Sequence, residues 1–463
     1  MSVYIPNTRT DREKMLARIG VGTLDALYRD IPAEIRLTDA LNLGAPLSEA
    51  ELGREIASLA EKNADAARAV CFLGAGAYDR LIPSAIKHMV SRSEFYTAYT
   101  PYQPEISQGT LQAIFEFQTM ISSLTGMDAA NASMYDGASA CAEAVLMAVR
   151  HTKRRRVLVA ETVHPETREV IRTYARFNGI EIAEIPEEGG LIDSRSLSAL
   201  LSEDTAGLVV QTPNFFGLIE DLSEIEPLTH ERGALLIASV ADPLSLAILE
   251  SPGRQGADIA VGEGQSFGMG LQFGGPYLGF MAVKAPLIRK LPGRIVGQTS
   301  DIEGKRAFVL TLQAREQHIR REKATSNICS NQGLNALIAT IYLTLLGKNG
   351  LREAATHSFE KAHYLKHKLV EAGMRPLFDA PFFDEFAVEL TADAREVNGR
   401  LMRNGVLGGY PLADVLPEAK YPGRARAMLL CVTEKRTKEE MDRLAVLLSE
   451  ACVEAASSER RER

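Results

Sequence analysis

A glycine-rich segment, Gly256–Lys284, carries the clearest candidate for a site that touches a ligand. It reads GADIAVGEGQSFGMGLQFGGPYLGFMAVK. The pattern predicts a short strand at Ile259–Val261, a sharp turn, and a second strand at Tyr277–Val283. Closely spaced glycines let the backbone take unusual conformations and approach another group closely. The residues at the head of the turn are Gln265, Ser266 and Phe267.

Ser266 is the one nucleophile in this turn. Gly264–Gly268 has the spelling GxSxG, which in hydrolases exposes a serine on a turn from a strand to a helix. Here glycines and then a predicted strand follow, so the spelling does not favour a hydrolase. No GxGxxG, GxxxxGK[ST] or HExxH string occurs, so the sequence carries no signature of a nucleotide-binding dehydrogenase, a P-loop enzyme or a zinc protease.

A second candidate is the tyrosine-rich segment 91–110, in which Pro101 and Pro104 prevent a regular helix. It predicts an extended loop. The loop is either packed on the surface or lines a pocket, where phenols both pack and form hydrogen bonds. Its tyrosines are Tyr96, Tyr99 and Tyr102.

Two further stretches suit anions. Asp136–Ser139 opens a predicted helix that runs through Arg150, and the free N–H groups of its first turn can bind an anion. Asp136 can equally act as the helix cap alone, which is the favoured interpretation. The cation-rich segment 312–328 ends in the hydroxyl-bearing turn Ala324–Asn327, a combination that suits phosphate or carboxylate contacts.

Composition narrows the class of protein. The chain has 463 residues and a net charge of −8, which disfavours nucleic acid as the main partner. It has no apolar run long enough for a membrane span, and its first residues do not form a signal peptide. The five cysteines lie far apart in the sequence, and no CxxC motif occurs. We therefore expect a protein of the reducing cytoplasm, with neither disulfides nor a metal site.

Short apolar strands alternate with helices between residues 157 and 262, which predicts an α/β domain with a mostly parallel sheet. The sequence predicts a helical N-terminal arm at 1–90, a large α/β domain at 91–345, a small α+β domain at 346–455 and a disordered tail at 456–463. Ligands of parallel sheets bind at the carboxyl ends of the strands. One crevice should therefore gather Ala160–His164, Pro213–Phe216, Ser239–Asp242 and Gly262–Ser266.

This order of parts resembles that of fold-type I enzymes of pyridoxal phosphate (PLP). Four strings resemble the P-protein family of the glycine cleavage system, glycine dehydrogenase (aminomethyl-transferring), and more narrowly the first of its two subunits where the enzyme is split. The resemblance covers nearly the whole chain. The strings are YTPYQPEISQGTLQAIFEFQTM, MYDGASACAEA, GEGQSFGMGLQFGGPYLGF and REQHIRREKATSNIC.

The resemblance implies that the second subunit carries the PLP lysine and that its position falls at Gln265 here. The position of the aspartate that pairs with the pyridine nitrogen falls near Ser239, with Asp242 close enough to compete. The resemblance also implies a vestigial crevice formed by His164, Asp136, Gly137, Ala138 and Ser139. Gln265 has no amine with which to hold PLP covalently, and Ser239 supplies no anion.

The same resemblance implies an oxidoreductase that decarboxylates glycine and passes the aminomethyl group to the lipoyl arm of the H-protein. This chain would complete the partner's site, with Thr325, Ser326 and Asn327 reaching the phosphate, and Tyr99, Tyr102 and Gln103 orienting glycine. A heterodimer and a dimer of heterodimers both remain open. The alternatives are an independent aminotransferase-like PLP enzyme and a non-catalytic scaffold subunit.

Overall fold

The computed structural model describes residues 6–37, 39, 41–329 and 331–462, with side chains described through Ala455. Residues 1–64 and residues 65–463 form two compact units. The first contains the predicted helices α1 (Arg9–Ile19) and α2 (Glu49–Ala60). Each begins with a capping box, in which the side chain of the cap and the acid three residues later bond to each other's backbone N–H.

The boundary between the units differs from the predicted end of the arm at residue 90. Val70 and Cys71 form strand β1, which pairs in parallel with β15 (Val406–Leu407) of the second unit. The helical character predicted for the arm at 1–90 is wrong for residues 70–83, which form β1 and an irregular segment. The helices α3 (Ser84–Val90) and α4 (Ser93–Tyr96) follow it.

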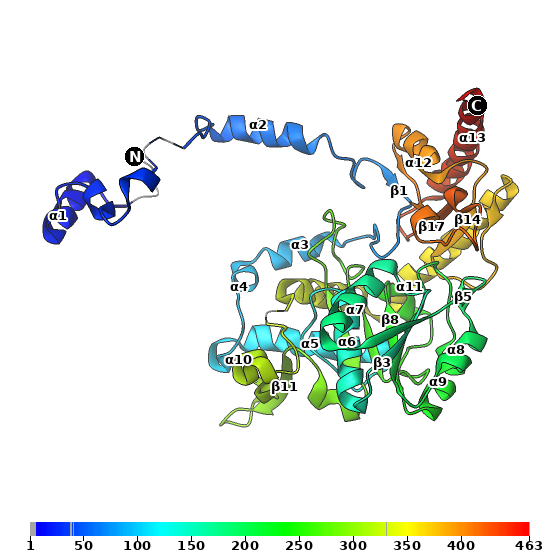
Figure 1. Cartoon of the computed structure of the whole chain (residues 1–463), viewed down its shortest axis with the longest axis horizontal. Coiled ribbons are helices and arrows are strands. Elements are labelled where there is room, and N and C mark those ends of the chain that lie inside the picture. The colour runs from blue at the N-terminus through cyan, green and yellow to red at the C-terminus, as the bar shows by residue number, and fades with distance from the viewer. Residues whose placement is uncertain (1–5, 38, 40, 330, 463) are drawn as a thin grey trace. The chain divides into compact units, whose positions relative to one another are not determined.

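A seven-stranded sheet lies at the centre of the second unit, in the order β2-β10-β9-β8-β7-β3-β4 (Figure 1). Strands β4, β3, β7, β8 and β9 run parallel, whereas β10 is antiparallel to β9 and to β2. The predicted α/β fold with a mostly parallel sheet is confirmed. The strands span β2 (Ala129–Ala130), β3 (Arg156–Ala160), β4 (Glu181–Ile185), β7 (Thr205–Gln211), β8 (Leu235–Val240), β9 (Ile259–Glu263) and β10 (Gly279–Val283).

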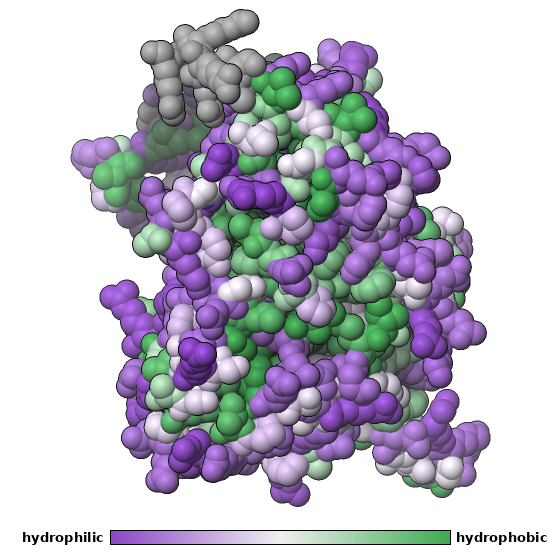
Figure 2. Space-filling model, turned by 90° about the vertical axis from the view of Figure 1, so that its right-hand side faces the viewer, coloured by the Kyte–Doolittle hydropathy of each residue, from purple (hydrophilic) through white to green (hydrophobic). Residues whose placement is uncertain are grey.

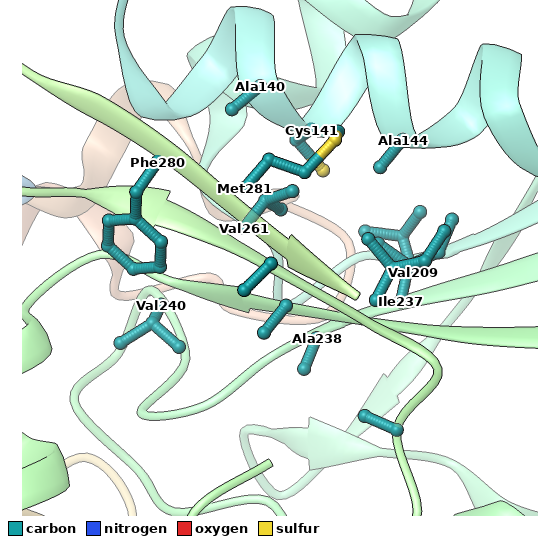
Figure 3. Close-up of a cluster of buried hydrophobic side chains, with 14 of the residues drawn as sticks. Ala140, Cys141, Ala144, Val209, Ile237, Ala238, Val240, Val261, Phe280 and Met281 are labelled. Carbon is teal, nitrogen blue, oxygen red and sulfur yellow. The ribbon is translucent and has the colours of Figure 1, made fainter. Parts of the chain in front are cut away.

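Helix α6 (Gly137–Thr152) packs along the middle of this sheet, against β7 to β10. Its small residues Ala140, Cys141 and Ala144 face the side chains of Val209, Ile237 and other strand residues (Figure 3). Small side chains let a helix approach a sheet closely, so α6 is held firmly and its first turn has a fixed position above the strand ends. Other helices beside the sheet are α5 (Gln108–Thr125), α7 (Pro165–Asn178), α8 (Ser194–Leu200) and α9 (Leu222–Glu231).

The C-terminal part contains a four-stranded sheet in the order β13-β14-β17-β16, covered by α12 and α13. Helix α11 leads into it and is interrupted at Gly347, whose φ of 58° is not helical. Its elements are α11 (Gly333–Glu371), β13 (Arg375–Pro376), β14 (Glu385–Glu389), α12 (Ala394–Arg403), β16 (Tyr410–Pro411), β17 (Ala427–Cys431) and α13 (Lys438–Glu462).

Helix α13 extends over most of the segment predicted as a disordered tail, 456–463, of which Arg463 lies outside the described residues. The small pairs β5 (Glu187–Glu188) with β6 (Leu191–Ile192) and β11 (Ile295–Ser300) with β12 (Arg306–Thr311) complete the strands. The face shown in Figure 2 mixes hydrophilic side chains with smaller apolar patches. No helix within the described residues is long and apolar enough to cross a membrane.

Candidate functional site

The carboxyl ends of β3, β7, β8 and β9 meet at one edge of the central sheet, as expected of parallel strands. Ser239 lies in β8 beside Gln211 of β7 and Val261 of β9. Gln211 also accepts a hydrogen bond from the backbone N–H of His164, at 2.8 Å. Ser239, His164 and the turn after β9 therefore lie together at the edge of the sheet where the sequence predicts the crevice.

Gln265 is fully buried in this crevice and uses its whole amide. Its Oε1 accepts a hydrogen bond from the backbone N–H of Tyr78 at 2.9 Å. Its Nε2 donates to the carbonyl oxygens of Tyr78 at 3.0 Å and Met269 at 2.8 Å. The Gln265 amide therefore pairs with both the N–H and the C=O of Tyr78, as the backbone of a neighbouring β-strand would.

We call residues 72–81 the cover segment, since they bring Tyr78 onto Gln265. The segment also passes His164, whose Nε2 lies 3.0 Å from the carbonyl oxygen of Ala75. Gly76 is needed at this crossing, because its φ is +100° and a Cβ there would lie 3.2 Å from Nε2 of His164. The cover segment thus occupies the space in front of the histidine.

The His164 ring is held in one tautomer by its partners. Nδ1 accepts from the backbone N–H of Glu166 at 3.2 Å, which leaves the proton on Nε2 for the Ala75 carbonyl. Burial lowers the pKa of His164 below its ordinary value, so the ring is neutral. Its edge packs against Phe215, with ring centroids 5.0 Å apart.

Arg80, the next-to-last residue of the cover segment, has a buried guanidinium and is 3% exposed. It forms ion pairs with Asp242 beyond β8, with Asp384 beside β14, and with Glu434 after β17, the last at 2.7 Å. It also donates to the hydroxyl of Ser358 in α11 at 3.0 Å. One side chain therefore joins the central sheet to the C-terminal sheet. Asp242, considered above for a cofactor role, is engaged by Arg80.

Glu385 holds the middle of the cover segment. Its carboxylate accepts from the backbone N–H of Ala75 at 2.6 Å and from the hydroxyl of Tyr78 at 2.9 Å. Gly74 passes so close that a Cβ there would lie 2.2 Å from Oε1 of Glu385. Burial raises the pKa of Glu385 to about 7, against an ordinary value of 4.5.

The start of α6 already holds a carboxylate. Asp136 caps the helix by accepting from the backbone N–H of Ser139 at 2.7 Å, as the favoured interpretation of this motif predicts. Glu263, at the end of β9, accepts from the N–H of Gly137 at 3.0 Å and from that of Leu278 at 2.8 Å. Burial raises the pKa of Glu263 to about 7. An acidic side chain of this chain thus lies where a phosphate would bind.

The residues predicted to orient glycine, Tyr99, Tyr102 and Gln103, do not contact Gln265 or the cover segment in the hydrogen bonds described above. The Tyr102 hydroxyl accepts from Arg294 at 3.1 Å, and Gln103 is exposed. Tyr99 is 79% exposed and lines a pocket of about 170 Å³ together with Phe95, Pro101, Asn331 and Leu334, among others. The three residues stay candidates for glycine binding.

The turn 325–327 has one buried and one exposed side chain. Ser326 is buried, and its hydroxyl donates to Glu143 of α6 at 2.7 Å, whereas Asn327 is exposed. Thr325 accepts through its carbonyl oxygen from Arg150. Among these three candidates for a phosphate contact, Asn327 has the exposed side chain, and Ser326 fixes the turn.

The cover segment is the functional feature that the sequence did not reveal. Its signal is the string Gly74-Ala75-Gly76-Ala77-Tyr78-Asp79-Arg80, where glycines alternate with small residues before a tyrosine and a charged pair. That composition indicates close backbone passage rather than helix. Glu263 was visible beside Gln265, but only the fold brings it to the start of α6.

This architecture is that of the fold-type I PLP-dependent transferases. Two solved structures share it at low identity: a sphingosine-1-phosphate lyase from Burkholderia pseudomallei (TM-score 0.66, 17% identity, 92% of this chain and 95% of that chain) and a NifS-like protein (TM-score 0.63, 13% identity, 82% and 98%). At these identities the likeness concerns the fold alone.

Closer similarities define the family. The family model for the glycine cleavage system P-protein matches residues 2–448, and the chain belongs to this family. The crystal structure of glycine decarboxylase (P-protein) of the glycine cleavage system in inhibitor-bound form has a TM-score of 0.89 and 45% identity, covering 97% of this chain and all of that one.

Curated relatives agree with this assignment. A probable glycine dehydrogenase (decarboxylating) subunit 1 from Geobacillus thermodenitrificans is 56% identical over 440 residues, 95% of this chain and 97% of the relative. The protein of the same name from Bacillus subtilis is 52% identical over 441 residues, with the same coverage of both chains. The resemblance inferred from the four sequence strings is confirmed.

Replacing Arg80 with alanine should destabilise the fold strongly. The change leaves Asp242, Asp384 and Glu434 buried without their cation, and removing one partner of a buried ionic network costs about 3–5 kcal/mol. The measurement is the free energy of unfolding from chemical denaturation. The control is Arg68→Ala, which breaks the exposed pair with Asp65 at 2.9 Å and should cost about 1 kcal/mol or less. Equal losses for the two variants would contradict the role assigned to Arg80.

Glu385 should make stability depend on pH. Its pKa is raised in the folded chain, so its contribution is fully present below the ordinary value of 4.5 and is lost as pH rises through about 7. Glu385→Gln stays neutral, so the unfolding free energy of the unmodified chain should fall relative to the variant by roughly 3 kcal/mol between pH 4.5 and 8. Glu396→Gln, at an exposed position of α12, is the matched control. A constant difference between Glu385→Gln and the unmodified chain across this pH range would refute the assignment.

Proposed function

We propose that this chain is the subunit of a two-chain glycine decarboxylase that does not hold PLP, and that it completes the active site of a lysine-bearing partner. The observation that carries the proposal is that both polar atoms of the Gln265 side chain bind the backbone of Tyr78. Gln265 is the residue to which the family resemblance assigns the lysine position. The relatives named as subunit 1 of glycine dehydrogenase (decarboxylating) support it.

The residues of this crevice do not fit PLP. A lysine would hold the cofactor covalently, and Gln265 has no nucleophilic amine. The start of α6, which would receive the phosphate, faces the carboxylate of Glu263. The ring of His164 is in contact with the cover segment instead of an open space. No step of the reaction is therefore assigned to this crevice.

The contribution of this chain to the reaction lies at its tyrosine-rich loop and at the turn 325–327. In the assembled enzyme, Tyr99, Tyr102 and Gln103 orient glycine, and Asn327 contacts the phosphate of the partner's PLP while Ser326 and Thr325 hold the turn. Exposure of Tyr99, Gln103 and Asn327 supports this arrangement, since a side chain that reaches a partner is exposed in the isolated subunit. When bound to the partner, PLP supplies the electron sink for decarboxylation.

The proposed partners are the second subunit, glycine, and the lipoyl-bearing H-protein that accepts the aminomethyl group in the cytoplasm. Purified together, this chain and its lysine-bearing partner should catalyse the glycine-dependent exchange of labelled CO2. This chain alone should not, because it lacks the amine that holds the cofactor. The assay compares each chain and the mixture at equal concentration.

The alternatives make different predictions in the same assay. A scaffold subunit leaves the partner fully active without this chain, and an independent PLP enzyme shows covalent pyridoxal in this chain alone. Either result would overturn the proposed function. Activity confined to the mixture supports it.

Replacing Gln265 with lysine should not restore the cofactor. Glu263 still occupies the start of α6, and the cover segment still fills the crevice. The variant also loses the paired bonds to Tyr78 and should unfold more easily, by about 1–3 kcal/mol, because the buried backbone groups are left unsatisfied. Incubation with PLP, borohydride reduction and mass spectrometry measure covalent incorporation. Stoichiometric labelling of the introduced amine in Gln265→Lys, absent from the unmodified chain, would contradict this account of the crevice.

A further inference from the structure

A second buried arginine, Arg294, has no carboxylate partner among the residues that the structure describes. Its side chain is enclosed, since the residue is 4% exposed. One terminal nitrogen donates to the hydroxyl of Tyr102 at 3.1 Å and the other to Oδ1 of Asn331 at 3.4 Å. Its Nε is buried without a hydrogen-bond partner. A buried cation with unused donors and only neutral partners is energetically costly unless an anion joins it.

Arg294 is part of a cluster that also contains Tyr102, His318 and a second cation, Arg315. The guanidinium lies over the Tyr102 ring, 5.4 Å from its centroid, and the same tyrosine ring contacts the His318 ring at a centroid distance of 5.6 Å. Arg315 donates to the carbonyl oxygen of Leu291, three residues before Arg294. Two nitrogens of Arg315 are buried without hydrogen-bond partners.

One acid belongs to this cluster. Glu316 lies 3.7 Å from Nδ1 of His318, and its Oε1 is buried without a partner. Its charge acts on Arg315, where burial lowers the pKa of the guanidinium below its ordinary value. Glu316 therefore acts on Arg315 and His318, whereas the hydrogen-bond partners of Arg294 are the neutral groups of Tyr102 and Asn331.

We propose that Arg294, with Tyr102 and Asn331, forms a binding site for a carboxylate, with Arg315 supplying additional positive charge. A carboxylate is the anion that matches a planar guanidinium by paired hydrogen bonds. Asn331, which accepts from Arg294, also lines the pocket of about 170 Å³ beside Tyr99, so one residue of the cluster borders that pocket. Figure 1 shows α4, α10 (Gln317–Arg320) and β11 gathered at this end of α5.

The carboxylate can come from two sources. It is that of glycine, which rests on the proposed function, or it is an acidic side chain or chain terminus of the partner subunit. Both share the chemistry that Arg294 recognises, and they differ in what they affect. A substrate carboxylate sets the glycine concentration needed for activity, whereas a partner carboxylate sets the affinity between subunits.

The experiment compares Arg294→Gln with the unmodified chain in the mixture with the lysine-bearing subunit. Loss of a hydrogen-bonded charge contact predicts a change of about ten- to hundredfold in one of two constants. A rise in the half-saturating glycine concentration identifies the substrate, and a rise in the dissociation constant of the two subunits identifies the partner. Arg289→Gln, an exposed arginine five residues earlier with the same change of charge, should alter neither.

A readout on this chain alone separates the carboxylate site from the proposed function. Acetate is the probe, compared with chloride at equal ionic strength. It should raise the thermal unfolding midpoint of the unmodified subunit and of Arg289→Gln more than that of Arg294→Gln. Arg294→Lys, which keeps the charge without the planar fork, should lose part of each effect, and it replaces Arg294→Gln if that variant does not fold.

The outcomes are distinct. If the mixture has no glycine activity, the proposed function fails, and the carboxylate site is decided by the subunit affinity and the acetate effect. If glycine dependence, subunit affinity and acetate effect are all the same for Arg294→Gln and Arg289→Gln, the carboxylate site is overturned.

Discussion

The second unit of this protein depends on the burial of Arg80. A guanidinium enclosed in protein is stable only when acids surround it, and here those acids come from three separate elements. Asp242 follows β8 of the central sheet, whereas Asp384 precedes β14 and Glu434 follows β17 of the C-terminal sheet. The ion pairs therefore fix the position of one sheet relative to the other. Because Arg80 lies in the cover segment, the same contacts hold that segment in place.

The space at the carboxyl ends of the strands is filled by groups of this chain. Gln265 forms a pair of hydrogen bonds with the backbone of Tyr78. The carboxyl group of Glu263 accepts a hydrogen bond from the N–H of Gly137 at the start of α6. The first of these contacts is mutual, since the cover segment buries Gln265, and Gln265 satisfies the backbone that the segment buries. A fold of this class can thus keep its shape without a ligand in its crevice.

Much of the fold was predictable because it depends on local patterns. The continuous apolar strands β3, β7 and β8 indicate a parallel sheet, and Gly137 after Asp136 indicates a helix start. The assignment of the lysine position to Gln265 comes from the family strings and stays a prediction. The partners of these residues were not predictable, because Tyr78 lies 187 positions away from Gln265 in sequence and Arg80 lies 304 positions from Asp384. Long-range pairs of this kind leave no periodic pattern. The irregular cover segment was therefore taken for part of the helical arm.

Arg80 and Arg294, both buried, differ in how their charge is balanced. Arg80 forms ion pairs with three acids of its own chain, so its positive charge is compensated within the described residues. Arg294 is equally enclosed but contacts only a phenol and an amide. Desolvation costs are similar for similar burial, so the proposed carboxylate supplies the negative charge that Arg294 lacks among the described residues. The two guanidiniums illustrate one constraint: a buried cation needs an anion nearby, which this chain provides for Arg80 and which, in our proposal, a bound carboxylate provides for Arg294.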